Sequence, residues 1–408
     1  MNIRKYNPQK DKKSVHRIWR EIGWLESGKE KIMDTFLEGN SSWVANIKSS
    51  PECLVSSSLG NMQYLNKVIP FNCITAVTTS HIARKQGLAG RLTAYAIAEE
   101  AKNGALVSAL GIFDQGYYNK LGFGTGGYEH IISFDPATLN IDRKPKVPTR
   151  LTEKDVNKIH ESRKKRLKHH GSCTLPSPKT TLSEIKWSDT SFGLGYFNKS
   201  GELTHHLWMN SKNVEVGPFR ILWMSYRNWD EFLDLLALLK SLGDQVRVMT
   251  IDEPADTQFQ DFLQRPFHHQ MVSKKSDFYQ TNRALAYWQM RMNDISLCLK
   301  NTHLQCTPIS FNLKLTDPIE RYLDPKLYWN GAGGNYIISL SKKSSATKGI
   351  NEKLPTLNAS VGAFTRLWLG ANSATSLSVS DDLSAPKKLL NLLDNAFRLP
   401  SPKPDWQF

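Results

Sequence analysis

The sequence predicts a protein of the α+β class, made of two similar mixed α/β segments and a third α+β segment. The order strand, turn, helix, strand occurs between residues 72 and 113 and again between residues 220 and 251. The chain of 408 residues is also longer than one hydrophobic core usually is. Finally, the C-terminal part has strand patterns of period two followed by helical patterns.

In the first segment, apolar residues recur at helical spacing at Val15, Ile18, Trp19 and Ile22. The run GLAGRLTAYAIAEEAKNG predicts a longer helix that ends at Gly104. Short runs rich in β-branched residues predict strands: SSWVANI, ECLVSSS, NCITAV and ALVSALGIF.

The middle segment repeats this order and reads as a weak second copy. Strands are predicted at FGLGYFN, RILWMSY and QVRVMTI, and a helix at NWDEFLDLLALLKSLG. The turn before that helix has no glycine. Asn228 and Glu231 form a capping-box pattern there, and Trp229 would crowd an incoming phosphate. We therefore expect no phosphate site in this segment.

In the third segment, alternating apolar and polar residues predict strands at ISFNLKLTD and NYIISLSKK. Apolar residues at helical spacing then predict helices at AFTRLWLGA and PKKLLNLLDNAF. Polar, Lys-containing connectors at residues 143–149 and 268–276 suggest where the segments meet. We place the three domains at residues 1–145, 146–286 and 287–408.

Composition excludes several classes of protein. The five cysteines are odd in number and form no CxxC pair, which argues against a disulfide framework and favours a cytoplasmic setting. No apolar run is long enough to span a bilayer, so we expect no membrane insertion. Adjacent histidines on a strand point to opposite faces, so we expect no metal.

A net charge of +15 favours anionic partners without specifying one. The densest basic run is RKKRLKHH, residues 163–170. It could be a nucleic-acid arm or a solvated helix face. Because no aromatic residues for base stacking are interleaved with it, we favour the helix face and expect no nucleic-acid partner.

The stretch VTTSHIARKQGLAGRL, residues 77–92, carries the chemistry. A strand ends, the chain turns, and a helix begins whose first N–H groups have no intrahelical partner. Gly87 leaves room for a phosphate to approach those amides, and Ala89 and Gly90 keep the next turn thin. Arg84 and Lys85 add positive charge beside the predicted phosphate site.

A second motif, YYNKLGFG at residues 117–124, lies just beyond the next predicted strand. Together the two motifs, Arg-x-x-Gly-x-Ala and Tyr-x-x-x-Gly-Phe, resemble those of the GNAT superfamily of acetyl-CoA-dependent N-acetyltransferases. The resemblance implies that acetyl-CoA is the co-substrate and Tyr118 the general acid. It also implies residues that bind the CoA pyrophosphate (Lys85, Gln86, Gly87, Leu88, Ala89 and Gly90), its pantetheine arm (Val77, Thr78 and Thr79) and a cover over that arm (Phe113 and Asp114).

The resemblance extends over essentially the whole chain. YWQMRMND, LWLGANSATSL, LLNLLDNAF and a terminal phenylalanine are similar to the enhanced intracellular survival protein family. That family has a catalytic GNAT domain, a degenerate GNAT-like domain and a sterol-carrier-like α+β domain. It implies a closed homo-oligomer, often a hexamer.

The general base is less evident from the residues. A phenol such as that of Tyr118 stays protonated at neutral pH and can donate to a departing thiolate. Four carboxylates are loose candidates for the base: Glu21, Glu26, Glu52 and Asp114. The family resemblance instead implies the terminal carboxylate, here that of Phe408.

The acceptor stays open between a small-molecule amine, aminoglycoside-like or polyamine, and a protein lysine. Gln407 is neutral where the family usually has an acidic residue, which weakens the case for a polycationic acceptor. The alternative function is a lipid- or ligand-binding protein that uses the sterol-carrier-like domain.

Overall fold

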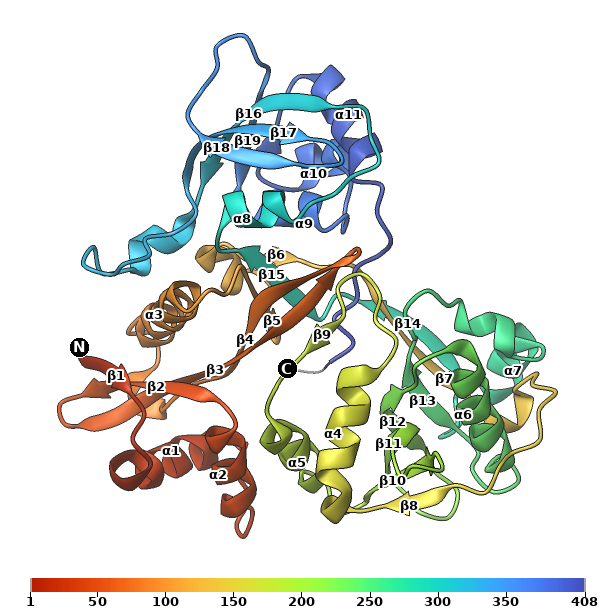
Figure 1. Cartoon of the computed structure of the whole chain (residues 1–408). Coiled ribbons are helices and arrows are strands. Elements are labelled where there is room, and N and C mark those ends of the chain that lie inside the picture. The colour runs from red at the N-terminus through yellow and green to blue at the C-terminus, as the bar shows by residue number, and fades with distance from the viewer. Residues whose placement is uncertain (1, 407–408) are drawn as a thin grey trace. The chain divides into compact units, whose positions relative to one another are not determined.

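The computed structural model of the chain describes residues 2–406, which form two compact units (Figure 1). The first unit combines residues 2–127 with residues 169–175 and the C-terminal part from residue 286 onward. The second unit combines residues 128–168 and 176–285. Each unit is therefore assembled from segments that are far apart in the sequence.

Within the described residues, the first unit contains an eight-stranded sheet in the order β1-β2-β3-β4-β5-β15-β6, with β9 paired to β3. Neighbouring strands are antiparallel except β4 and β5, which are parallel. The strands are β1 (Asn2–Lys5), β2 (Ser41–Ile47), β3 (Ser50–Tyr64), β4 (Lys67–Thr79), β5 (Val107–Gly111), β6 (Gly124–Thr125), β9 (Cys173–Thr174) and β15 (Trp288–Met292).

Helices cover both faces of this sheet. The side chain of Asn7 caps α1 (Pro8–Glu21), whose predicted apolar face packs on Val44 and Leu54 together with α2 (Glu30–Glu38). Helix α3 (Leu88–Lys102) lies on the opposite face, where it shares a hydrophobic cluster with Ala45 and Cys53. These two residues are the chain neighbours of Val44 on β2 and Leu54 on β3, so their side chains point to the other side of the sheet. The helices predicted for this segment are confirmed, and α2 is an addition.

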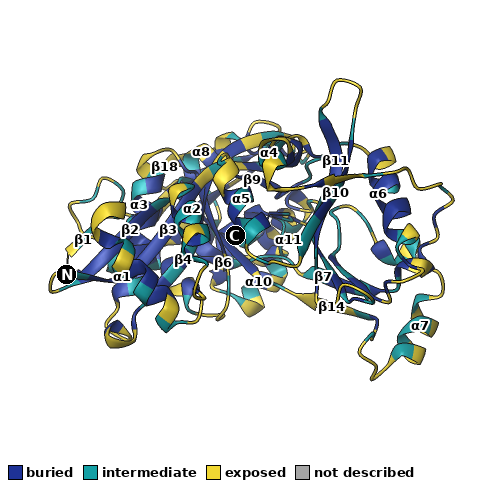
Figure 2. Ribbon diagram, turned by 90° about the horizontal axis from the view of Figure 1, so that it is seen from below, coloured by how far each residue is buried: buried dark blue, intermediate teal, exposed yellow. Residues whose placement is uncertain are grey.

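The second unit repeats this plan, so the predicted second copy is confirmed. Its sheet has the order β14-β7-β13-β12-β11-β10-β8, and β12 and β13 are parallel as β4 and β5 are. The strands are β7 (Glu129–Phe134), β8 (Thr149–Leu151), β10 (Ser191–Phe197), β11 (Leu203–Ser211), β12 (Phe219–Ser225), β13 (Met249–Asp252) and β14 (Thr281–Leu285). The helices are α4 (Val156–Lys165), α5 (Pro178–Lys186), α6 (Trp229–Ser241) and α7 (Pro266–Ser273). Figure 2 shows buried strands and an α7 whose residues are exposed or of intermediate exposure.

Two strands join sheets that lie far from them in the sequence. Strand β7 directly follows the short β6 along the chain, but it pairs with β13 and β14 in the second unit. Strand β15 pairs with β5 and β6 in the first unit. The run YWQMRMND, which opened the predicted third segment, therefore supplies a central strand to the first sheet.

The C-terminal part of the first unit forms a five-stranded sheet, β18-β17-β16-β19-β20, among the described residues. Its strands are β16 (Ile309–Thr316), β17 (Gly334–Leu340), β18 (Ser345–Lys348), β19 (Thr356–Ser360) and β20 (Leu383–Ser384), and its helices are α8 (Ile295–Lys300), α9 (Val361–Trp368), α10 (Ala374–Ser380) and α11 (Lys387–Ala396). One hydrophobic core joins this sheet to β3, β4, β5 and β15. The predicted α+β character is confirmed.

The basic run at residues 163–170 is not the solvated helix face that we expected. Arg163 is 4% exposed, forms an ion pair with Glu184 and lies 4.2 Å above the ring of Trp223. Arg166 is also buried and donates to the carbonyl oxygen of Arg163. The expectation is wrong for these two arginines because the sequence run does not show the acidic and aromatic residues that receive them.

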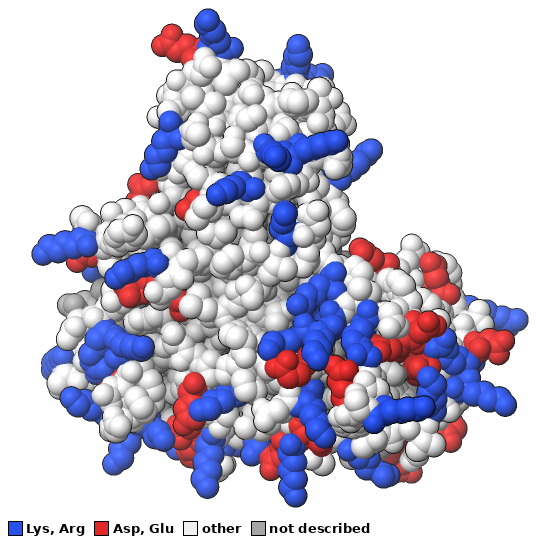
Figure 3. All heavy atoms as spheres, viewed as in Figure 1, with Lys and Arg blue, Asp and Glu red and all other residues white. Residues whose placement is uncertain are grey.

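Charged side chains of both signs also lie on the surface. On the face shown in Figure 3, Lys and Arg side chains are spread over the surface and Asp and Glu lie among them. None of the helices in residues 2–406 is long and apolar enough to cross a membrane. The five cysteines form no disulfide, and the described part of the chain holds no cluster of three or more His, Cys, Asp or Glu suited to a metal ion.

Candidate active site

The predicted phosphate turn lies between β4 and α3. After a short 3-10 turn, η1 (His81–Ala83), residues 84–87 are exposed, and α3 begins at Leu88. Gly87 has φ +75°, and a side chain there would meet no atom within 4 Å. In the described structure no side chain caps this helix end. Its first N–H groups have no intrahelical partner, and the positive end of its dipole lies next to the exposed residues 84–87.

Gly90 has a packing role that the sequence did not show. A Cβ atom at this position would lie 3.1 Å from Cε1 of Tyr322, in the 3-10 turn η6 (Pro318–Tyr322). The absence of a side chain therefore lets η6 approach α3. Ala89 is half-buried, whereas Arg84, Lys85 and Gln86 are exposed.

The parallel strands β4 and β5 separate at the same end of the sheet. Their last paired residues are Ile74 and Leu110, although β4 continues to Thr79. Ala76 adopts φ +51° where the register between β3 and β4 shifts. The predicted pantetheine residues, 77–79, therefore lie beyond the last β4–β5 pair. Strand β5 thus does not pair with the backbone of these residues.

Tyr118 opens the 3-10 turn η2 (Tyr118–Leu121) and is 3% exposed. Its ring has edge contacts with Phe113, Tyr117 and Phe123, at centroid distances of 6.4, 4.9 and 6.2 Å. Burial raises the pKa of Tyr118 far above its usual value, so the hydroxyl is protonated at neutral pH. Phe113 is 81% exposed and Asp114 is also exposed.

The structure brings the two motifs together in one hydrophobic cluster. Tyr118 and Leu88 belong to it, and Val77 packs against it. Cys53 on β3, which the sequence did not suggest, is also a member. Its Sγ lies 3.4 Å from the Thr79 hydroxyl, and burial raises the pKa of the thiol to about 11. Cys53 is therefore a neutral, buried neighbour of the tyrosine.

The loose candidates for the base have other partners or are exposed. Arg17 binds both Glu21 and Glu52 through its guanidinium, with N–O distances of 3.0 and 2.8 Å. Burial favours the neutral form of Glu21, but hydrogen bonds from the His81 N–H group and Arg17 lower its pKa. Glu26 is largely exposed and pairs with a neighbouring lysine, and Asp114 is exposed.

The C-terminal tail is docked as far as it is described. Trp406 is 4% exposed and belongs to the large core of the first unit. The N–H group of Cys173 donates to the carbonyl oxygen of Pro404 at 2.7 Å, and that of Lys403 to His170 at 2.9 Å. Strand β9 then pairs with β3 through Cys173 and Met62. The tail is thus docked as far as Trp406, and Gln407 and Phe408, the residue of the expected base, lie outside the described residues.

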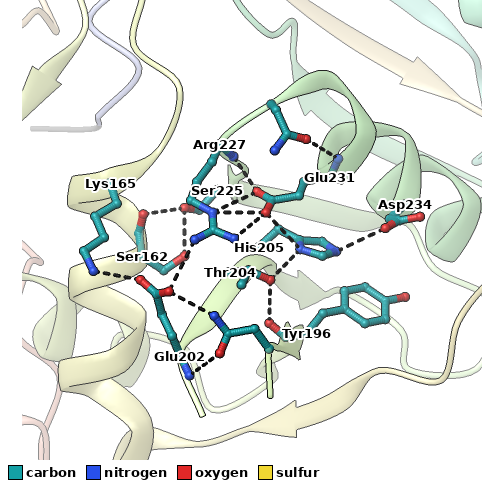
Figure 4. Close-up of polar contacts among 12 residues, drawn as sticks. Ser162, Lys165, Tyr196, Glu202, Thr204, His205, Ser225, Arg227, Glu231 and Asp234 are labelled. Carbon is teal, nitrogen blue, oxygen red and sulfur yellow. Dashed lines mark hydrogen bonds and ion pairs between the residues drawn. The ribbon is translucent and has the colours of Figure 1, made fainter. Parts of the chain in front are cut away.

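The corresponding turn of the second unit is capped by the protein itself (Figure 4). The side chain of Asn228 accepts a hydrogen bond from the Glu231 N–H group at 3.0 Å. The Glu231 carboxylate binds the N–H group and guanidinium of Arg227. Only one half of the predicted capping box forms, because Glu231 bonds to Arg227 rather than to the amide of Asn228. This helix end therefore keeps fewer donors for a phosphate.

The same region holds a buried polar cluster of the second unit. His205 stacks on Tyr196, and its ring nitrogens lie 4.0 Å from Glu231 and 3.7 Å from Asp234 (Figure 4). Burial lowers the pKa of His205 despite these carboxylates, so the ring is neutral at pH 7. Asp234 in turn binds Arg143. The cluster joins β11 to α6 and the preceding connector.

The fold, two mixed α/β units of the same plan with an additional α+β part, is similar to that of solved structures described as GCN5-related N-acetyltransferases. Solved structures share it over the whole chain. A probable N-acyltransferase from Enterococcus faecalis has a TM-score of 0.80 at 16% identity, covering 100% of this chain and 99% of the other. A GCN5-related N-acetyltransferase from Anabaena variabilis has a TM-score of 0.79 at 15% identity, and Eis1 from Mycobacterium abscessus 0.76 at 14%, each covering 100% of both chains. No family model and no curated protein matches the sequence.

Proposed function

We propose that this protein is an N-acetyltransferase that transfers the acetyl group of acetyl-CoA to a primary amine. The observation that carries the proposal is the meeting of three features in one cluster of the first unit. These are the separated ends of β4 and β5, the uncapped start of α3, and the buried Tyr118. The fold shared with N-acetyltransferases supports it.

The residues present fit acetyl-CoA. A pyrophosphate would bind at the N–H groups that follow Gly87, where the side-chain position is open and Arg84 and Lys85 are exposed. The extended pantetheine arm would bond to the backbone of residues 77–79, as an added strand does. Phe113, exposed above Tyr118, would cover the arm.

In the reaction, the amine nitrogen forms a bond to the acetyl carbon, and the bond from that carbon to sulfur breaks. The electron pair leaves on the CoA sulfur, and we assign Tyr118 as the group that protonates it. Its raised pKa keeps the hydroxyl protonated, and no described residue hydrogen-bonds to that hydroxyl. We assign removal of the proton from the acceptor ammonium to the terminal carboxylate of Phe408. The docking of the tail as far as Trp406 and the engagement of Glu21 and Glu52 by Arg17 support this choice.

The acceptor that we propose is an aminoglycoside-like or polyamine amine, or a protein lysine. We also propose the domain limits 1–145, 146–286 and 287–408, a sterol-carrier-like third domain, a cytoplasmic location and a homo-oligomer. The alternative lipid-binding function finds no support in the third part of the chain. Its apolar residues, such as Phe311, Leu313 and Phe364, are fully buried in the shared core.

The test is release of free CoA thiol from acetyl-CoA in the presence of polyamines, aminoglycosides or lysine peptides. We expect acceptor-dependent turnover, with acetylated product by mass spectrometry. Titration calorimetry should give one equivalent of CoA per chain, because the second unit caps its own helix. Two equivalents would contradict the assignment of the second unit. Fatty-acid or sterol binding without turnover would favour the alternative.

A further inference from the structure

Two buried polar side chains of strand β15 contact the turn that carries Tyr118. Gln289 and Arg291 lie two residues apart and therefore on one face of the strand, and both are 0% exposed. Nε2 of Gln289 donates to Oδ1 of Asn119 at 3.1 Å. Nη1 of Arg291 donates to the carbonyl oxygen of Leu121. Both contacts fall within η2.

Asn119 is the residue that closes this turn. Its Nδ2 group donates to the carbonyl oxygen of Phe123 at 3.1 Å, and its Oδ1 accepts from the Gly116 N–H group at 3.1 Å. The contact from Gln289 therefore holds the side chain that bridges the turn. The contact from Arg291 holds the backbone three residues after Tyr118.

A fully buried ion pair fixes Arg291. Its Nη2 lies 2.5 Å from Oδ2 of Asp317, and both side chains are 0% exposed. The Asp317 carboxylate also accepts from the N–H groups of Ile319 and Ala332. Nε of Arg291 donates to Asn293 at 3.2 Å. With its partners fixed in this way, the guanidinium has little freedom to leave the turn.

Gly122, the glycine of the Tyr-x-x-x-Gly-Phe motif, leaves room for the contact between Arg291 and the turn. Gly122 has φ +80°, and a Cβ atom there would lie 2.8 Å from Nη1 of Arg291 and 2.9 Å from Oδ1 of Asp317. It would also lie 2.5 Å from Val361 of α9. Only glycine lets the ion pair lie directly against the turn.

The ion pair is also connected to the strands that separate at the proposed CoA site. A chain of hydrogen bonds between buried side chains leads from Asn293 to Ser108 on β5 (2.9 Å), then to Asn72 on β4 (2.6 Å) and Ser57 on β3 (3.0 Å). The turn with Tyr118 is thus fixed to the same strands that would hold the pantetheine arm.

We propose that Arg291, held by Asp317, is a positioning residue for Tyr118 and sets the place of its hydroxyl through the carbonyl oxygen of Leu121. Arg291 touches no reacting atom in this scheme. The inference rests on the proposed function, since it requires Tyr118 to be the general acid. It also gives a functional reason for a strand that enters the first sheet from the C-terminal part of the chain.

The test is a double-mutant cycle of Arg291→Lys and Tyr118→Phe in the full chain. Lysine keeps a charge for Asp317, but it cannot reach the carboxylate and the Leu121 carbonyl with the fixed fork of arginine. We expect kcat to fall at least tenfold in Arg291→Lys while KM for acetyl-CoA stays within about twofold. The double variant should be no slower than Tyr118→Phe alone, because the two changes remove one effect.

Two further measurements separate positioning from a general loss of structure. Hydrogen exchange should rise in the peptide covering residues 113–123 of Arg291→Lys at a temperature where the fold is intact. The matched control is Arg4→Lys, which weakens the Arg4–Asp11 pair of the same unit away from this turn. It should leave kcat and that peptide unchanged. If Arg291→Lys does not fold, Asp317→Asn, which keeps the size of the side chain and weakens its hold on Arg291, replaces it in the same cycle.

Each outcome decides the inference. If the rate losses of the two single variants multiply in the double variant, the positioning role is wrong. It is also wrong if hydrogen exchange of residues 113–123 does not change in Arg291→Lys. Either result leaves the proposed function intact. Full activity of Tyr118→Phe would overturn the acid itself and the inference with it.

Discussion

The ring of Tyr64 on β3 stacks on the ring of Trp368 in α9, with centroids 4.1 Å apart and an angle of 3° between the planes. The Tyr64 hydroxyl also donates to the carbonyl oxygen of Trp368 at 2.9 Å. More than 300 residues separate the two in the sequence. The contact lies in a core that the first sheet and the C-terminal part share, so these parts should fold together.

Trp368→Ala should therefore destabilise the whole first unit. Removing a fully buried tryptophan costs about 3–5 kcal/mol, and this side chain also donates to Thr302. Denaturant unfolding should show one transition for residues of β3 and α9, shifted to lower denaturant. The control is Trp24→Ala, since Trp24 is 46% exposed and should cost less than about 1 kcal/mol. Separate transitions for β3 and α9 would contradict a shared core.

The two ends of α3 offer a matched test of the phosphate site. Gly87 and Gly104 both have positive φ, and neither has an atom within 4 Å of an added Cβ. Replacing either glycine by alanine should lower the free energy of unfolding by a similar amount, about 1 kcal/mol. Only Gly87→Ala should weaken acetyl-CoA binding, by tenfold or more in calorimetry, because only that end would bind the pyrophosphate. Equal affinity of the two variants would place the phosphate elsewhere.

Much of this site is predictable from the sequence because it depends on local signals. The turn before Leu88 and the motif around Tyr118 follow from glycine spacing and from helix and strand patterns that the structure confirms. Arg291 and Asp317 gave no such signal. A charged residue in a strand of alternating pattern suggests an exposed face, and only the pairing of β15 with β5 shows that both faces are buried.

Strand exchange was unpredictable for a related reason. No strand is predicted from the sequence at residues 129–134 or 288–292, and a period-two pattern would not specify which sheet such a strand joins. The basic run at residue 163 shows the same limit: its partners, Glu184 and Trp223, are distant in the sequence. Long-range pairing, rather than local propensity, decided these cases.

The second unit should lose stability in mild acid. Burial lowers the pKa of His206 to about 3 and that of His160 to about 4, from 6.5. The folded unit therefore keeps both rings neutral while the unfolded chain takes up protons below pH 6.5. Above pH 6.5 these two histidines should not reduce the free energy of unfolding. At pH 5 each should lower it by about 2 kcal/mol. Melting curves between pH 8 and pH 5 measure this, and His206→Gln should flatten the dependence. A pH-independent melting temperature would contradict it.

Extension of the C-terminus tests the proposed base. Adding one glycine after Phe408 moves the carboxylate but leaves the anchor at Trp406 in place. We expect kcat to fall at least tenfold with little change in acetyl-CoA affinity, whereas Phe408→Ala at native length should keep part of the activity. An N-terminal extension of equal length is the control. Equal turnover of the extended and native chains would leave the tail with a packing role alone.

The most direct test of the proposed activity is acceptor-dependent thiol release by Tyr118→Phe beside the native chain. Phenylalanine keeps the ring contacts with Phe113, Tyr117 and Phe123 and removes only the hydroxyl. Loss of a general acid predicts a fall in kcat of about 10²–10⁴-fold with unchanged acetyl-CoA affinity. Because the pKa of Tyr118 is raised, native turnover should also persist to alkaline pH without loss of the acid form. A variant as fast as the native chain would contradict acetyl transfer through Tyr118.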